Sequence, residues 1–305
     1  MVTASAGSKR PEGPSRRDRR VSRDGVRLAV TEWPARHPGA PSVALVHGLA
    51  SSSRIFHALA RDLAPRFHVV AYDQRGHGRS DRPGSGYGFD QTTADLGRVL
   101  AATGLARPVV VGHSFGANVV LEFAVEAPER VAGIVLVDGG FGSMAERMDW
   151  ATARVALAPP RLSGRPLDRL LEGARTRTPL GEFWSQDVEA TMRSLFEVGP
   201  DGRARPRLTR ANHMRILRAM WAQPTTDLLA SVAVPTLVVA ARPSRPTPEE
   251  AGFYELKKQA ARRIRRVGPN VRFEWMTGVH DLPLQRPSEL AGRIAAFAED
   301  AAGDR

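Results

Sequence analysis

The amino-acid sequence contains no cysteine. This absence excludes disulfides, thiolate metal sites and a cysteine nucleophile. It fits a reducing compartment, and we expect a cytoplasmic protein. No apolar run reaches the roughly 18 residues that a membrane-spanning helix requires. The basic N-terminus is followed by no hydrophobic segment, so the sequence predicts neither a membrane span nor a signal peptide.

Lysine is nearly absent as well, since Lys9, Lys257 and Lys258 are the only lysines among 44 basic residues. The formal net charge is +12 at pH 7, and an excess of arginine beside abundant Ala, Gly and Pro is typical of a GC-rich genome. An acidic partner is the alternative explanation. A nucleic-acid-binding protein would carry a basic patch interleaved with aromatic residues. None is found, so we expect no nucleic-acid partner.

Apolar segments and helical patterns alternate through most of the chain. Residues 1–19 have almost nothing to bury and predict a disordered basic tail, and residues 21–33 predict two strands around a turn at Asp24-Gly25. Further strands are predicted at 42–46, 67–72, 109–111, 131–137, 235–241 and 271–276, with helices at 54–64, 90–103, 117–127, 247–266 and 287–297. Strand–helix alternation is typical of an α/β fold with a mostly parallel sheet and helices on both faces. The basic run 257–266 predicts a solvated helix face.

The alternation is interrupted between residues 141 and 232. This stretch shows no clear central strand, is broken by prolines and holds Trp150, Trp184 and Trp221. We predict a helical cap over 141–232, inserted into an α/β core of residues 20–140 and 233–302. Its tryptophans either line a substrate pocket or hold the small cap together.

The most informative stretch is residues 108–118, PVVVGHSFGAN. Three valines predict a short strand, G-x-S-x-G follows at once, and a helical pattern begins at Ala117. A serine on such a strand–turn–helix junction is held in a strained conformation that exposes its hydroxyl, and the glycines let strand and helix approach closely. Ser114 is therefore the candidate nucleophile.

A serine hydroxyl needs a base, and the base needs a third group that orients it. Ser114, Asp138 and His280 each follow the carboxyl end of a predicted strand. Such ends meet at one edge of a parallel sheet. The sequence thus predicts that these three side chains converge.

These features together resemble the α/β-hydrolase-fold serine hydrolases with a helical cap. The resemblance rests on His47-Gly48 after a strand, the glycine-rich loop 73–80, the elbow 112–116 and the stretch 278–283, GVHDLP. It covers residues 21–299 and is weakest in the cap. It implies that Ser114 attacks a carbonyl carbon, that His280 transfers the proton, and that the backbone N–H groups of Leu49 and Phe115 bind the oxyanion. It implies neither a cofactor nor a metal.

The acid departs from the commonest pattern of this family. The loop after strand 235–241 reads ARPSRP and has no carboxylate before Glu249 and Glu250, while Ser244 stands where Asp is expected. Some members, such as the haloalkane dehalogenases, place the acid after the preceding strand, where this chain has Asp138. We predict Asp138, with Glu249 or Glu250, or no functional acid, as the alternatives.

The expected function is hydrolysis of an ester, lactone or thioester of a small to medium, largely apolar molecule through an acyl-enzyme. Epoxide hydrolases and haloalkane dehalogenases need Asp as nucleophile, so Ser114 argues against both. Carbon–carbon bond hydrolysis and cofactor-free perhydrolysis also use serine and stay open. A non-catalytic binding protein on the hydrolase scaffold is the alternative from another class, supported by the missing acid at the usual loop.

Overall fold

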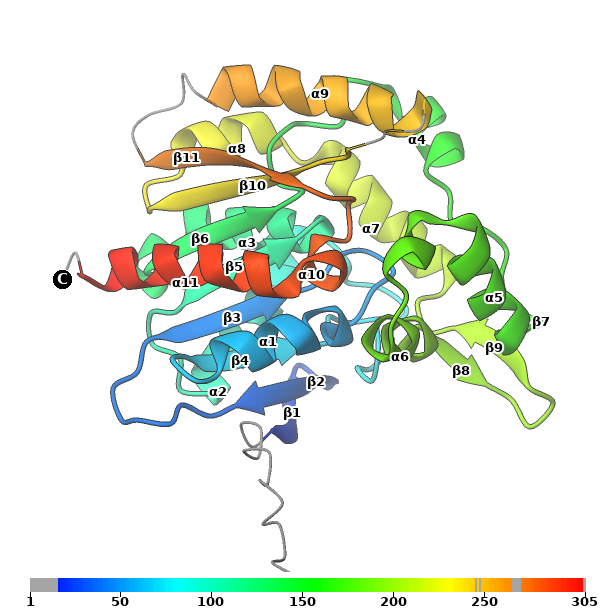
Figure 1. Cartoon of the computed structure of the whole chain (residues 1–305), viewed down its shortest axis with the longest axis horizontal. Helices are drawn as coiled ribbons and strands as arrows, with labels where there is room; N and C mark the ends of the chain where they lie inside the picture. Colours follow the sequence, from blue (N-terminus) through cyan, green and yellow to red (C-terminus); the bar gives the residue numbers. More distant parts are fainter. Residues whose placement is uncertain (1–15, 245, 247, 265–269, 304–305) are drawn as a thin grey trace, which may run out of the picture.

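The computed structural model describes residues 16–244, 246, 248–264 and 270–303. Its centre is an eight-stranded sheet in the order β1-β2-β4-β3-β5-β6-β10-β11 (Figure 1). The strands are β1 (Arg17–Arg23), β2 (Val26–Trp33), β3 (Ser42–Val46), β4 (His68–Tyr72), β5 (Val109–His113), β6 (Gly133–Val137), β10 (Thr236–Arg242) and β11 (Val271–Thr277). All neighbours from β4 to β11 pair in parallel, and β1 and β2 pair antiparallel. The predicted α/β fold is confirmed.

Helices cover both faces of the sheet, as the near-continuous apolar runs of its central strands require. Successive residues of a strand point to opposite faces, so Val110 packs in one hydrophobic cluster while Val109 and Val111 pack in the other. One face is covered by α1 (His57–Leu63) and α11 (Pro287–Gly303); the other by α2 (Phe89–Ala102), α3 (Phe115–Glu126), α8 (Thr225–Ser231) and α9 (Pro248–Ile264).

The N-terminal hairpin begins earlier than the sequence indicates. The predicted tail ran to residue 19, but β1 starts at Arg17 and pairs with β2 as far as Glu32. Backbone pairing and polar contacts hold this strand although it has few apolar residues. Asp18 accepts a hydrogen bond from Thr31 at 2.9 Å and pairs with Arg79 at 3.1 Å. The predicted turn is present, with positive φ at Asp24 and Gly25. The rest of the predicted tail, residues 1–15, lies outside the described residues.

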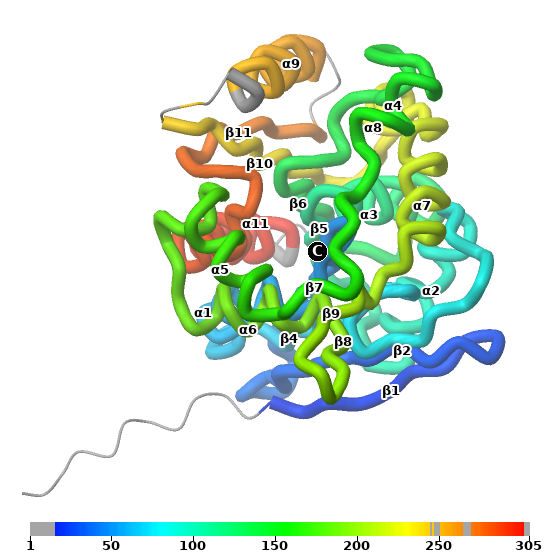
Figure 2. The backbone as a smooth tube through the Cα atoms, turned by 90° about the vertical axis from the view of Figure 1, so that its right-hand side faces the viewer, coloured from blue at the N-terminus to red at the C-terminus, as the bar shows by residue number. Residues whose placement is uncertain are grey.

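The inserted segment 141–232 carries four α-helices outside the sheet before α8 returns to the core, namely α4 (Trp150–Ala156), α5 (Leu167–Arg177), α6 (Gln186–Ser194) and α7 (Arg210–Ala222). They lie toward the right-hand end of the molecule in Figure 1, the end that faces the viewer in Figure 2. A 3-10 helix, Pro179–Phe183, lies between α5 and α6. The segment also contains an unexpected sheet of β7 (Arg165–Pro166), β9 (Arg203–Pro206) and β8 (Phe196–Val198). These strands are too short to produce a recognisable alternation in the sequence.

The aromatic side chains of the inserted segment mostly pack within it. Trp150 and Trp221 lie with ring centroids 6.0 Å apart, and the Arg218 guanidinium covers both rings. Trp184 packs against a small cluster that includes Leu171 and Phe196. Of the two roles considered for the tryptophans, these contacts favour holding the segment together.

A buried ion pair fixes the glycine-rich loop after β4. The Arg75 guanidinium donates two hydrogen bonds to the Asp95 carboxylate on α2, at 2.6 and 2.8 Å, and both side chains are almost fully buried. A further bond from Arg75 reaches the carbonyl of Gly86. The loop is thus fastened to the neighbouring helix.

None of the helices in the described part of the chain combines the length and the apolar character that a membrane crossing would require.

The Arg75–Asp95 pair generates a stability prediction. Replacing Asp95 by Asn leaves a buried guanidinium without its counter-charge, and we expect the free energy of unfolding to fall by about 3 kcal/mol. Urea denaturation measures this change. The matched control is Glu172→Gln, which breaks the exposed Arg169–Glu172 pair and should cost less than about 1 kcal/mol. Equal losses for the two variants would contradict the structural role of the buried pair.

Candidate active site

Ser114 lies at the junction of β5 and α3 with φ 54° and ψ −121°, a strained conformation for a residue with a side chain. The two glycines of the elbow permit this geometry. A Cβ on Gly112 would lie 2.3 Å from the Gly116 carbonyl oxygen, and one on Gly116 would lie 2.1 Å from the Val46 carbonyl oxygen. The sharp turn predicted from G-x-S-x-G is therefore present.

The structure brings Asp138 and His280 together at the carboxyl edge of the sheet. Nδ1 of His280 lies 2.7 Å from Oδ2 of Asp138, which follows β6. This contact places the imidazole N–H toward the carboxylate and leaves Nε2 free to accept a proton. No hydrogen bond joins Ser114 to His280 within the described residues, as is common before a substrate tightens such a contact.

Asp138 is buried and surrounded by hydrogen-bond donors. Oδ1 accepts from the backbone N–H of Ala241 at 2.8 Å, and Nζ of Lys257 lies 2.8 Å from each carboxylate oxygen. Burial by itself would raise the pKa of Asp138, but the hydrogen bond and charge of His280 and the ammonium of Lys257 lower it to about 2. The carboxylate is thus ionised throughout the neutral range.

The His280 side chain is 53% exposed, on the cavity side of this pair. Desolvation opposes protonation of the ring, but the hydrogen bond and the negative charge of Asp138 outweigh it and raise the pKa of His280 above its ordinary value. A base with a raised pKa loses its unprotonated form as the pH falls.

His113, inside the elbow, supports the loop that carries the candidate base. Its Nε2 lies 2.9 Å from the backbone carbonyl of His280, and the two ring centroids are 4.8 Å apart. Burial lowers the pKa of His113 to about 4. The ring is therefore neutral at pH 7 and donates from Nε2 to that carbonyl.

The backbone N–H groups of Leu49 and Phe115 have no hydrogen-bond partner among the residues that the structure describes. Leu49 follows β3, and a Cβ on the preceding Gly48 would lie 3.0 Å from Cβ of Ser114. Phe115 begins α3, whose N-terminal dipole end favours negative charge. Both N–H groups are therefore candidate donors beside Ser114.

Two neutral histidines link the loop after β3 to the glycine-rich loop 73–80. Burial lowers the pKa of His47 to about 4 and that of His77 to about 3. Nε2 of His47 accepts from the backbone N–H of Gln74 at 3.0 Å, and Nε2 of His77 accepts from that of Ala50 at 3.3 Å. These contacts fit loop-organising roles.

A cavity of about 180 Å³ lies in front of Ser114 and His280. Leu49 and Ile55 line it from the core, and apolar residues of the inserted segment line it from the other side, namely Leu180, Met192 and Leu195. The cavity therefore combines a candidate nucleophile and a candidate base with aliphatic side chains, and the polar residues Ser51, Thr191 and Asp281 line it as well.

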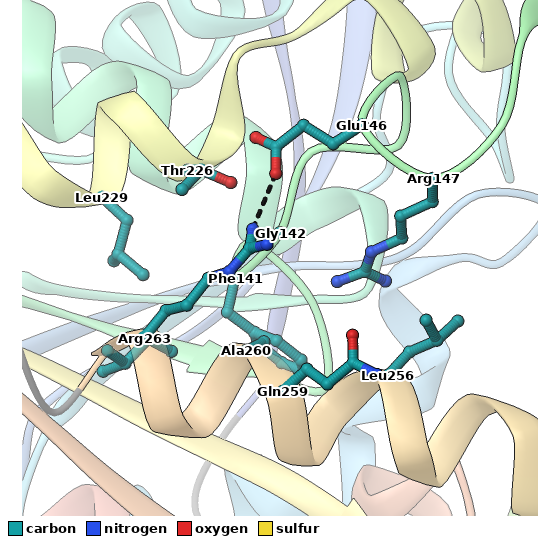
Figure 3. A pocket seen from close by; sticks show the side chains of 11 residues that line it. Phe141, Gly142, Glu146, Arg147, Thr226, Leu229, Leu256, Gln259, Ala260 and Arg263 are labelled. Atoms are coloured by element: carbon teal, nitrogen blue, oxygen red, sulfur yellow. Dashed lines mark hydrogen bonds and ion pairs between the residues drawn. The ribbon is translucent and has the colours of Figure 1, made fainter.

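A second and larger cavity, of about 220 Å³, lies between α9 and the start of the inserted segment (Figure 3). Leu256, Gln259 and Arg263 of α9 face it, and Arg263 pairs with Glu146 at 2.8 Å. Neither Ser114 nor His280 lines it. The larger cavity thus lacks the candidate nucleophile and base, so the smaller cavity is the candidate active site.

The alternative acids are placed differently. Ser244 is exposed in the loop after β10. Glu249 and Glu250 fall in the first turn of α9, and their side chains lie outside the described part of the chain. The carboxylate that contacts His280 is that of Asp138. In the described ranges no group of three or more His, Asp and Glu side chains is arranged to hold a metal ion.

Sequence reasoning missed Lys257, which was assigned to a solvated helix face but reaches the buried carboxylate of Asp138. Helical periodicity alone gives no sign of this contact, since the partner lies 119 residues earlier. Lysine is scarce in this chain, but the neighbouring residue Lys258 is a lysine as well, so composition does not single out Lys257.

The elbow generates a prediction. We expect Gly112→Ala to lower the free energy of unfolding by about 3 kcal/mol, because the methyl group of the introduced alanine would meet the Gly116 carbonyl and force the backbone to shift. The control is Gly292→Ala in α11, where a Cβ meets nothing within 4 Å. This substitution should stabilise the helix by about 0.5–1 kcal/mol. Urea denaturation measures both changes. An unchanged free energy of unfolding for Gly112→Ala would refute the close approach of strand and helix at the elbow.

Comparison with curated proteins finds relatives among hydrolases. The chain is 33% identical over 137 residues to 2-(acetamidomethylene)succinate hydrolase of Mesorhizobium japonicum, covering 45% of this chain and 48% of that protein. It is 43% identical over 122 residues to epoxide hydrolase A of Mycobacterium tuberculosis, covering 38% and 37%. These matches span about half or less of the relatives' own length.

Comparison with solved structures extends over nearly the whole chain. The crystal structure of E-2-(acetamidomethylene)succinate hydrolase superposes with a TM-score of 0.73 at 22% identity, covering 93% of this chain and 100% of that one. At this identity the likeness shows the fold. The family model of the alpha/beta hydrolase fold matches residues 41–265. The chain belongs to the alpha/beta hydrolase family.

Proposed function

We propose that the protein is a serine hydrolase that cleaves an ester, or a lactone or thioester, through an acyl-enzyme on Ser114. The observation that carries the proposal is the 2.7 Å contact between His280 and Asp138 at the cavity that also holds Ser114. The hydrolases among the relatives support the reaction class. Segment 141–232 would act as the cap over this site.

In the proposed first step, His280 accepts the hydroxyl proton of Ser114 as the serine oxygen attacks the carbonyl carbon. Asp138 stabilises the imidazolium that forms. The backbone N–H groups of Leu49 and Phe115 bind the oxyanion, a contact that typically contributes about 10²- to 10³-fold per donor. His280 then protonates the leaving group, which departs and leaves the acyl group on Ser114.

In the proposed second step, His280 accepts a proton from water as the water oxygen attacks the acyl carbon. The same N–H groups bind the second oxyanion. Return of the proton to the Ser114 oxygen releases the carboxylic acid and restores the enzyme.

The walls of the cavity support an apolar acyl group of modest size. Leu180, Met192 and Leu195 offer no charge to a substrate, and Asp281 is the acidic residue among the cavity's lining residues. The volume of about 180 Å³ is below the roughly 300–1,000 Å³ of sites for drug-sized ligands. We therefore favour short-chain substrates. The epoxide hydrolase reaction is not proposed, because the resemblance to those enzymes implies an Asp nucleophile where this chain has Ser114.

A fluorophosphonate probe tests the nucleophile. We expect it to label intact protein at Ser114, because the base and the oxyanion donors activate this hydroxyl, and Ser114→Ala should abolish labelling. Mass spectrometry of the labelled peptide measures this. Resistance of the folded protein under conditions that label a known serine esterase would refute the proposal and favour a binding protein on this scaffold.

The acid is tested by Asp138→Asn. Loss of the carboxylate removes the group that orients His280 and stabilises its imidazolium, so we expect turnover of p-nitrophenyl acetate to fall about 10³- to 10⁴-fold with the fold intact. Circular dichroism supplies the folding control. An unchanged rate would remove Asp138 from the mechanism. Comparing p-nitrophenyl esters with vinylogous diketones as substrates separates ester hydrolysis from carbon–carbon bond hydrolysis.

A further inference from the structure

Lys257, on α9, reaches the Asp138 carboxylate of the candidate active site. Its Nζ lies 2.8 Å from both carboxylate oxygens of Asp138 and 3.3 Å from the backbone carbonyl of Ala241. The side chain is only 17% exposed. By contrast, the adjacent Lys258 is more exposed and pairs with Glu255 one turn earlier on the same helix.

Three donors therefore fix the Asp138 carboxylate. The N–H of Ala241 binds Oδ1, while the imidazole of His280 and the ammonium of Lys257 meet at Oδ2. A carboxylate held from three directions cannot rotate about its last bond without losing a partner. The oxygen that faces His280 is thereby kept in place.

We propose that Lys257 is a positioning residue for the proposed hydrolysis, which holds the Asp138 carboxylate against His280 and sets the lower pH limit at which that histidine acts as a base. The inference rests on the proposed function only for its catalytic readout. The contact between Lys257 and Asp138 stands on its own.

The charged groups that face His280 decide the sign of the effect. Asp138 at the end of β6 and Asp281 on its own loop favour the protonated ring, whereas Lys257 from α9 disfavours it. His113, behind the ring, is neutral at pH 7 because burial lowers its pKa to about 4. Lys257 is thus the positive charge that offsets the carboxylates.

Removal of the ammonium should shift the base toward its protonated form. Without Lys257 the negative charge of Asp138 acts on His280 undiminished, so the pKa of His280 rises. Because only the unprotonated ring accepts the serine proton, the acidic limb of the pH–rate profile moves to higher pH. Lys257 and His280 contact the same oxygen of Asp138, at 2.8 and 2.7 Å. A neighbouring charge within about 4–6 Å moves a pKa by about one unit or more.

The experiment compares Lys257→Met, Lys257→Arg and the control Lys258→Met. The pH dependence of kcat/KM is measured with p-nitrophenyl acetate on the full chain. We expect Lys257→Met to move the acidic limb upward by about one pH unit and to lower kcat with little change in KM. Lys257→Arg keeps the charge and should keep the limb near its wild-type position. Lys258→Met should match the wild type.

A double variant tests whether Lys257 acts through Asp138. In the Asp138→Asn background the carboxylate charge is gone, so Lys257→Met should have much less effect on kcat than it has in the wild type. Equal effects in both backgrounds, or a lower melting temperature for Lys257→Met with an unmoved acidic limb, would overturn the proposal and leave a purely structural ion pair.

An NMR titration of the His280 ring separates this inference from the proposed function. If the wild type neither reacts with a fluorophosphonate nor hydrolyses esters, the proposed function fails, but the ring still titrates. A higher pKa of His280 in Lys257→Met than in the wild type supports the electrostatic part of the proposal. An identical pKa in the two proteins overturns it.

Discussion

The buried carboxylate of Asp138 is the constraint on which the rest of the site depends. A negative charge inside a protein is unfavourable unless donors and opposite charge surround it. Here the donors come from three separate parts of the chain: the loop after β11, the end of β10 and helix α9. These contacts therefore tie the loop after β11, the end of β10 and helix α9 to the end of β6, in addition to the backbone pairing of β10 with β6 and β11.

The parallel sheet and the local geometry of its strand ends explain how distant residues converge. Ser114, Asp138 and His280 are separated by long stretches of chain, yet each follows a strand whose carboxyl end meets the same edge. Ser114 and Asp138 both adopt positive φ, so neither continues the direction of its strand. Gly139 allows the close contact between the two turns, since a Cβ there would lie 2.4 Å from the Ser114 carbonyl oxygen.

The sequence predicted the core of the fold well because its signals are local. Valine-rich runs and helical periodicity predicted the strands and helices of the core, several to within a residue. The position of Ser114, Asp138 and His280 after strand ends predicted that these residues converge. Contacts between remote segments left no such signal. Lys257 looks like any exposed helix residue until α9 is packed beside β10. The three short strands of segment 141–232 and the start of β1 at Arg17 depend on pairing partners rather than on their own residues.

The wall of the smaller cavity is made by two parts of the chain under different constraints. The core side carries the buried charges and close backbone contacts, where few substitutions fit. The opposite side is formed by Leu180, Met192 and Leu195 together with Thr191. The 2.7 Å contact between Ser52 and Ser194 links this side to the loop after β3. Exchange of these aliphatic residues changes the shape available to a ligand while the carboxylate and imidazole stay as they are. The shape of the cavity and the contact between Asp138 and His280 are thus set by different side chains.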